Sequence, residues 1–149
     1  HDISRASELL SKIQTLHPDL KIKLLSDFIE KQSLFDILIV DRVGYLADIY
    51  RYSTFTFIGG SFKKRVHSVM EPLCALNIVM FGPHYKNNPE AIQTLHQNLS
   101  FEISSSKDVI DLIQSHSSTD LQKIRAEIKA FVQNQTGSSR TIALELLKI

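Results

Sequence analysis

The chain has 149 residues, of which 43% are hydrophobic and 22% are charged, and these proportions are typical of one soluble globular domain with its own core. The formal net charge of +1 excludes a strong overall attraction for nucleic acid, so any affinity for an anion must be local. No apolar run reaches the roughly 20 residues that span a bilayer, and no signal-peptide pattern is present. Because the chain begins with His1 rather than Met, we expect a soluble piece of a longer protein.

Apolar, β-branched runs alternate with helical patterns along the chain. Strands are predicted over residues 20–25, 36–40, 54–58, 78–81 and 99–103. Helices are predicted over residues 6–16, 44–52, 66–76, 89–97, 107–115, 120–133 and 139–147. This alternation, with short connections, predicts a Rossmann-like, doubly wound and mostly parallel α/β sheet of about five or six strands, with helices on both faces. We therefore expect a single domain over 1–149.

Single residues mark the ends of several predicted elements. Ser4 is expected to cap the first helix, and Asn77 is expected to end the third helix in the left-handed conformation. Pro89 suits the first turn of the fourth helix, because its missing N–H would be unpaired there in any case. Cys74 lies in the apolar run Leu-Cys-Ala-Leu, so we expect a buried structural thiol.

The stretch from Phe57 to Glu71 is the best candidate for a ligand site. A buried strand ends there in Gly59-Gly60-Ser61 and leads to a helix, and open α/β sheets bind anions at such turns. Adjacent glycines permit positive φ angles and a close approach of backbone N–H groups to a ligand. The turn matches neither a P-loop nor a G-x-G-x-x-G fingerprint. A tight turn without any ligand is the alternative.

The residues after the turn supply charge and hydrogen-bonding groups. Lys63, Lys64 and Arg65 would attract an anionic ligand, and an ordinary solvated loop is the alternative. His67 and Glu71 are four residues apart, which predicts one face of a helix N-terminus. Glu71 would then accept hydrogen bonds from vicinal hydroxyls such as those of a ribose, while His67 would shape the pocket. An N-terminal capping pair is the alternative for these two side chains.

The sequence predicts neither a metal site nor a cofactor. Cys74 is the single cysteine, so an internal disulfide is excluded and a zinc-thiolate site is not expected. His67 and Glu71 do not form a zinc-binding H-E-x-x-H motif, and no third ligand is evident beside them.

Segments within residues 37–90 resemble the C-terminal half of 3-deoxy-D-manno-octulosonic acid (Kdo) transferases. They are IVDRVGYLADIYRYSTFTFIGGSF and then HSVMEPLCALNIVMFGPHYKN. In that family a D-T-x-G-E-L segment precedes a strand ending in G-G-S, and H-N-x-x-E-P and a strand ending in F/M-G-P-H/N follow. The chain departs from these motifs at Arg42, Tyr45 and Ser68, and it carries Lys63-Lys64-Arg65-Val66 where the family has glycines.

The resemblance implies the donor-binding C-terminal domain of a GT-B glycosyltransferase, which has two Rossmann-like domains. By motif position, the residues implied in binding the nucleotide sugar are Val43, Gly44, Leu46, Gly59, Gly60, Ser61, His67, Ser68 and Glu71. Gly60 and Ser61 would line the phosphate of CMP, and Glu71 would face the ribose. The resemblance implies no catalytic residue in this chain, because the family's catalytic carboxylate lies in the N-terminal domain.

The resemblance also implies a function for the parent protein. The family transfers Kdo from CMP-Kdo to a lipid A precursor, in lipopolysaccharide biosynthesis at the cytoplasmic face of the bacterial inner membrane. The acceptor and the membrane would contact a missing N-terminal domain, so this chain alone would bind the nucleotide weakly and transfer nothing. Two alternatives are a divergent, non-catalytic nucleotide-binding module and another GT-B relative that uses a UDP-sugar.

Overall fold

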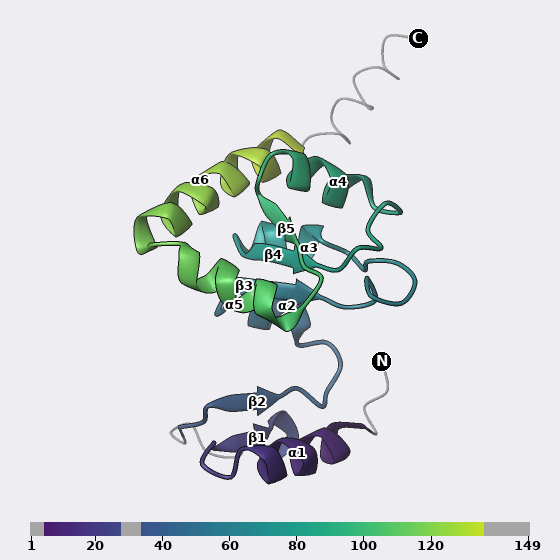
Figure 1. The fold of residues 1–149 in the computed structure, drawn as a ribbon, viewed down its shortest axis with the longest axis vertical. Helices are drawn as coiled ribbons and strands as arrows, with labels where there is room; N and C mark the ends of the chain where they lie inside the picture. The colour runs from purple at the N-terminus through teal and green to yellow at the C-terminus, as the bar shows by residue number, and fades with distance from the viewer. Residues whose placement is uncertain (1–4, 28–33, 136–149) are drawn as a thin grey trace. The chain divides into compact units, whose positions relative to one another are not determined.

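A computed structural model describes residues 5–27 and 34–135 of the chain. The chain divides into two compact units between Asp48 and Ile49, and each unit is described by itself (Figure 1). The single domain expected over 1–149 stays a prediction, because the position of one unit relative to the other is not determined. The predicted cap Ser4 and the helix predicted over 139–147 lie outside the described residues.

The first unit consists of one helix beside a small parallel sheet. Its elements are helix α1 (Arg5–Leu16), strand β1 (Ile22–Leu24), a short 3-10 helix (Leu25–Asp27) and strand β2 (Ile37–Ile39). The two strands pair in parallel, and α1 packs on β1. Aspartates on either side of β2 tie the strands together, since Asp36 accepts a bond of 2.8 Å from the Lys21 N–H and Asp41 accepts one of 2.9 Å from the Ser26 N–H.

The second unit contains a parallel sheet of three strands in the order β3-β4-β5. Helix α2 (Leu46–Tyr50) leads into this unit, and its further elements are β3 (Phe55–Ile58), α3 (Met70–Cys74), β4 (Ile78–Phe81), α4 (Pro89–His96), β5 (Ser100–Glu102), α5 (Ser106–Ser115) and α6 (Ser118–Gln135). The register places Ile58 beside Phe81 and Phe81 beside Glu102, so the carboxyl ends of all three strands lie at one edge.

Helices cover both faces of the three-stranded sheet, as predicted. Ile58 and Phe81 join Leu73 of α3 and Ile128 and Phe131 of α6 in a single buried cluster. Phe57 and Phe101 alternate with these strand residues and belong to the opposite face. Helix α5 lies on that face, because the ring of Phe101 contacts the ring of His116 at the end of α5, with the ring centroids 5.7 Å apart.

The predicted class of a parallel α/β fold is confirmed, but each sheet is smaller than expected. The described residues form five strands in sheets of two and three, where one sheet of five or six was predicted. Strand β4 and helix α4 begin where the sequence predicts, because Asn88 caps α4 through its side chain and Pro89 occupies the first turn.

The third predicted helix is wrong at its N-terminal end, because α3 begins only at Met70. The backbone N–H of Val66 donates to the carbonyl oxygen of His84 at 2.8 Å, and this long-range bond replaces the expected helical one. The C-terminal prediction is also wrong, since Leu76 and not Asn77 adopts the left-handed conformation, with φ of 61°. Cys74 is exposed rather than buried, because its neighbour Leu73 faces the core.

Candidate functional site

Two loops meet at the carboxyl edge of the three-stranded sheet. The first, called the glycine loop here, covers residues 59–69 and follows β3; the second loop covers residues 82–88 and follows β4. The Val66 N–H donates to the His84 carbonyl oxygen at 2.8 Å, and the His84 N–H donates to the Ser61 carbonyl oxygen at 2.9 Å. These reciprocal bonds hold the two loops against each other, so the edge of the sheet is a defined surface.

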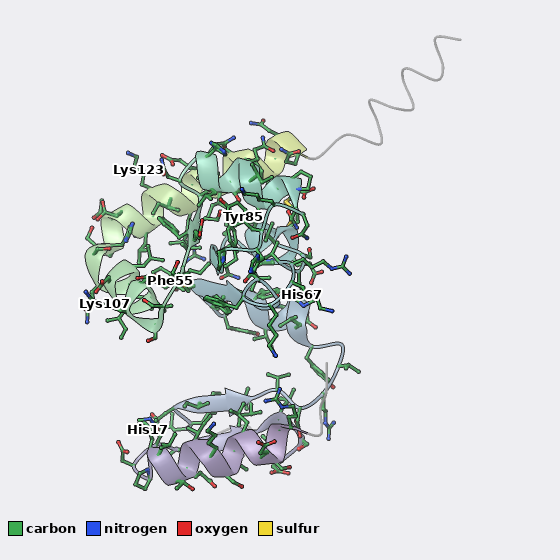
Figure 2. The ribbon with its side chains drawn as sticks, turned by 45° about the vertical axis from the view of Figure 1, so that its right-hand side comes forward. His17, Phe55, His67, Tyr85, Lys107 and Lys123 are labelled. Atoms are coloured by element: carbon green, nitrogen blue, oxygen red, sulfur yellow. The ribbon has the colours of Figure 1, made fainter. Side chains whose placement is uncertain are left out.

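Asparagine side chains strengthen the contact between the loops. The amide of Asn87 donates to the carbonyl oxygen of Val66 at 3.2 Å, and the amide of Asn88 donates to the carbonyl oxygen of His67 at 3.4 Å. Asn88 also caps α4, so the glycine loop is tied to the start of that helix. In Figure 2, the label His67 marks the glycine loop and the label Tyr85 marks the second loop.

Ser61 fixes the turn of the glycine loop from inside. The residue is fully buried, and its hydroxyl donates to the Ile58 carbonyl oxygen at 3.1 Å while accepting a bond of 2.7 Å from the Gly82 N–H. Both loops therefore start from one buried hydroxyl. Because the side chain is already used in this way, only backbone groups near Ser61 are left to face a ligand.

Gly60 has the backbone conformation that the sequence predicts. Its φ is +87°, and a Cβ at this position would collide with the carbonyl oxygen of Arg65 and lie 2.9 Å from Nε2 of His67. The imidazole of His67 thus covers the turn. Gly60 and Phe62 are both exposed, and within residues 5–27 and 34–135 their backbone N–H groups meet no hydrogen-bond acceptor.

Positive charge gathers on the outer side of the glycine loop. The N–H groups of Lys63 and Lys64 both donate to the Gly60 carbonyl oxygen, at 3.0 and 3.1 Å, which forms a tight turn. The side chains of Lys63, Lys64 and Arg65 are exposed. Among the described residues, none of the three takes part in a salt bridge, so their charges are available to an anionic ligand.

Glu71 lies on helix α3, but His67 does not. Glu71 is the second residue of α3 and is exposed, whereas His67 lies in the glycine loop, before the start of that helix. The predicted pair on one helix face is therefore wrong. The capping alternative is not supported either, because Val69 is the N-cap of α3 and makes no side-chain capping bond. Ser68 is exposed just before this helix.

Tyr50 is a neighbour of Glu71 that the sequence did not reveal. Burial raises the pKa of the Tyr50 hydroxyl, and the negative charge of Glu71 raises it further. The carbonyl oxygen of Tyr50 accepts a bond of 2.9 Å from the amide of Asn77, whose own oxygen accepts one of 3.0 Å from the Ser53 hydroxyl. The fully buried Asn77 therefore holds the end of α2 beside the start of β4.

Tyr85 of the second loop packs against the core cluster. Its ring lies 5.1 Å from the ring of Phe81, measured between centroids. Burial raises the pKa of the Tyr85 hydroxyl, and the nearby Glu102 carboxylate, which accepts a hydrogen bond from this hydroxyl, raises it further. The carboxyl ends of β4 and β5 are thus joined through side chains as well.

Three predicted site residues belong to the first unit. Val43 and Gly44 lie in the loop between β2 and α2, and Leu46 is the first residue of α2; all three are exposed. Gly44 has a φ of +93°, as a glycine in a tight turn allows. Because the two units are described separately, the proximity of these residues to the glycine loop stays a prediction.

The described part of the chain contains no group of three or more His, Cys, Asp or Glu side chains placed to hold a metal ion. None of the helices in residues 5–27 and 34–135 has the length and apolar character needed to cross a membrane.

Comparison with curated proteins finds Kdo transferases. The chain is 29% identical over 118 residues to the 3-deoxy-D-manno-octulosonic acid transferase of Rickettsia prowazekii, and the match covers 76% of this chain. It is 33% identical over 121 residues to the protein of that name from Chlamydia muridarum, again over 76% of this chain. The chain spans about a quarter of the length of these relatives, 26% and 27%. No family model matches the chain.

Among solved structures, the chain resembles the C-terminal CMP-Kdo binding domain of WaaA from Acinetobacter baumannii. The TM-score is 0.68, the sequences are 20% identical, and the match covers 85% of this chain and 69% of that one. This likeness confirms the predicted α/β fold. In sequence the chain is thus similar to 3-deoxy-D-manno-octulosonic acid transferases, and in fold it is similar to the C-terminal domain of one of them.

Proposed function

We propose that this chain is the CMP-Kdo-binding domain of a glycosyltransferase that transfers Kdo to a lipid A precursor in lipopolysaccharide biosynthesis. The observation that carries the proposal is the glycine loop. It presents exposed backbone N–H groups at Gly60 and Phe62 and three exposed cations next to them, at the carboxyl edge of a parallel sheet. In a chain of this family, such a surface suits the phosphate of a nucleotide sugar.

Each part of the site receives a role in this proposal. The backbone of Gly59, Gly60 and Ser61 lines the phosphate, while Lys63, Lys64 and Arg65 supply positive charge. Glu71 accepts hydrogen bonds from the ribose hydroxyls. His67 and Ser68 hold the loop and the donor. Val43, Gly44 and Leu46 border the nucleotide.

The proposed chemistry places the reacting groups outside this chain. A catalytic carboxylate and the lipid acceptor belong to the N-terminal domain of the parent protein, which acts at the cytoplasmic face of the bacterial inner membrane. During transfer the CMP leaving group gains negative charge, and fixed N–H dipoles and cations stabilise such a charge. The glycine loop is placed to provide both.

Calorimetric titration of the chain with CMP and with UDP tests this proposal. We expect a preference for CMP, and the Glu71→Ala variant should bind CMP at least about tenfold more weakly, because hydrogen bonds to a charged group contribute about 1.5–3 kcal/mol. Glu127→Ala is the matched control, since Glu127 is exposed on α6 and should leave the affinity unchanged.

The other outcomes point to the alternative functions. A preference for UDP would indicate a GT-B relative that uses a UDP-sugar. Absence of binding for both nucleotides at millimolar concentration would indicate a module that has lost its donor site. Equal losses for Glu71→Ala and Glu127→Ala would remove Glu71 from the site.

A further inference from the structure

The exposed cations of the glycine loop lie in a short segment, residues 62–65, which is called the cation arch here. Bonds to the second loop fix both of its ends. Before the arch, the N–H of Gly82 donates to the Ser61 hydroxyl at 2.7 Å, and the N–H of His84 donates to the Ser61 carbonyl oxygen at 2.9 Å. After the arch, the N–H of Val66 donates to the His84 carbonyl oxygen at 2.8 Å. The arch is therefore held between two fixed points.

Packing also holds Phe62, the first residue of the arch. A Cβ on Gly82 would lie only 3.0 Å from Cδ2 of Phe62, so the ring rests closely on the backbone of that glycine. The ring also stacks on Phe57 of β3, with the ring centroids 5.8 Å apart. The first end of the arch is thus fixed by backbone bonds and by a side-chain contact together.

Two asparagine amides of the second loop hold the other end. The Asn87 amide donates to the carbonyl oxygen of Val66 at 3.2 Å, and the Asn88 amide donates to the carbonyl oxygen of His67 at 3.4 Å. These two acceptors follow directly after Arg65, the last cation of the arch. The two bonds therefore fix the direction in which the backbone leaves the arch.

Asn88 connects the arch to the core of the second unit. Its side-chain oxygen accepts a bond of 2.9 Å from the N–H of Ala91 and so caps α4. Ala91 is itself fully buried and belongs to the core cluster. The amide bond to His67 thus joins the glycine loop to a helix that packs on the core, and not only to another loop.

We propose that Asn87 and Asn88 are positioning residues for the nucleotide phosphate. They act through residues 62–65, whose cations and backbone they keep in the arrangement that meets the ligand. The inference rests on the proposed function and adds two residues of the second loop to it. A loop that is already ordered loses less conformational entropy on binding, so preorganisation raises affinity. Without the two amides, part of the binding free energy would be spent on ordering the arch.

The test uses two substitutions that remove the amide donors. Asn87→Ala removes the bond to Val66, whereas Asn88→Ser removes the bond to His67 and keeps a good N-cap, because serine caps helices about as well as asparagine. Each variant should bind CMP about 2- to 10-fold more weakly in calorimetry, as expected for the loss of one hydrogen bond. Asn134→Ala is the matched control, since Asn134 is exposed on α6 and should leave the affinity unchanged.

Two further measurements separate positioning from a merely structural role. The melting temperature of Asn88→Ser should match that of the unmodified chain, because the cap of α4 is kept. In both variants without ligand, the backbone NMR order parameters of Lys63, Lys64 and Arg65 should fall, whereas those of α4 should stay high. The affinity would then be lost together with the order of the arch, in a chain that is as stable as before.

The possible failures can be told apart. An unchanged affinity for CMP in both variants, or unchanged order parameters in the arch, would overturn the positioning role and leave the proposed function standing. Absence of CMP binding by the unmodified chain would overturn the proposed function and the positioning role together.

Discussion

Single side chains decide what the glycine loop can offer a ligand. The buried hydroxyl of Ser61 and the missing side chain of Gly60 set the course of the backbone, whereas Lys63, Lys64 and Arg65 project into solvent. The first two residues therefore act through the shape of the loop and the last three through their charge. Substitutions should separate these effects, since shape affects stability and charge affects binding.

Replacement of Ser61 by alanine tests its structural role. The change leaves the buried N–H of Gly82 without its acceptor, and an unsatisfied buried group costs about 1–3 kcal/mol. We expect the free energy of unfolding, measured with a chemical denaturant, to fall by that amount. Ser106→Ala is the control, since this serine is exposed and surface changes usually stay within about 0.5 kcal/mol. Equal effects of the two substitutions would show that the Ser61 bonds contribute little.

Replacement of Lys63, Lys64 and Arg65 by alanine tests their charge. If they contact the phosphate, the triple variant should bind CMP at least about tenfold more weakly, and its affinity should depend less on salt concentration. The same substitutions at Lys123, Arg125 and Lys129 on α6 give a control with the same change in total charge. Calorimetry at two salt concentrations measures both effects. An unchanged affinity would show that the three residues are ordinary surface residues that do not contact the phosphate.

At the scale of elements, local signals gave better predictions than long-range ones. The start of α4 follows from Asn88 and Pro89, and the start of α5 follows from its serines, since Ser105 is its N-cap. The start of α3 could not be found in this way. It depends on a bond between Val66 and His84, which are distant in the sequence, and no local pattern reports that bond.

In the candidate site, too, local features were predictable from the sequence and long-range contacts were not. The positive φ of Gly60 was predictable from the paired glycines, because few other residues adopt it. The packing of Phe62 on Gly82 and the approach of Tyr50 to Glu71 join separate segments, so the sequence did not reveal them. Asn77 misled the prediction, since asparagine also suits the left-handed end of a helix, whereas here its amide is used inside the core.

The capping box of α5 predicts a pH dependence of stability. Bonds from the N–H of Ser104, the hydroxyl of Ser105 and the N–H of Ser105 lower the pKa of Asp108 from its ordinary value of 3.8. The stabilisation is therefore complete above the unfolded pKa and is lost as the pH falls through the lower folded value. Unfolding free energies of the unmodified chain and of Asp108→Asn should converge at acid pH. A difference that persists below the folded pKa would contradict this account.

At the scale of the whole molecule, the chain matches one part of longer proteins. It spans about a quarter of its curated relatives, and its matched structure is a C-terminal domain. The glycine loop and the second loop form one edge of the second unit. We propose that this edge is one wall of a donor cleft, and that another domain of the parent protein provides the opposite wall with the catalytic carboxylate and the acceptor.

The most direct test of this account is an NMR titration of the isotope-labelled chain with CMP. We predict that the backbone amide resonances of Gly60 and Phe62 shift the most, because their N–H groups contact the phosphate. Those of Lys63 and Lys64 should shift with them, because their charged side chains lie next to it. The amide of Ala130 on α6 serves as a reference that should stay unchanged. Saturable shifts at the glycine loop would support CMP binding at this edge of the sheet. Shifts confined to other elements would contradict the central claim.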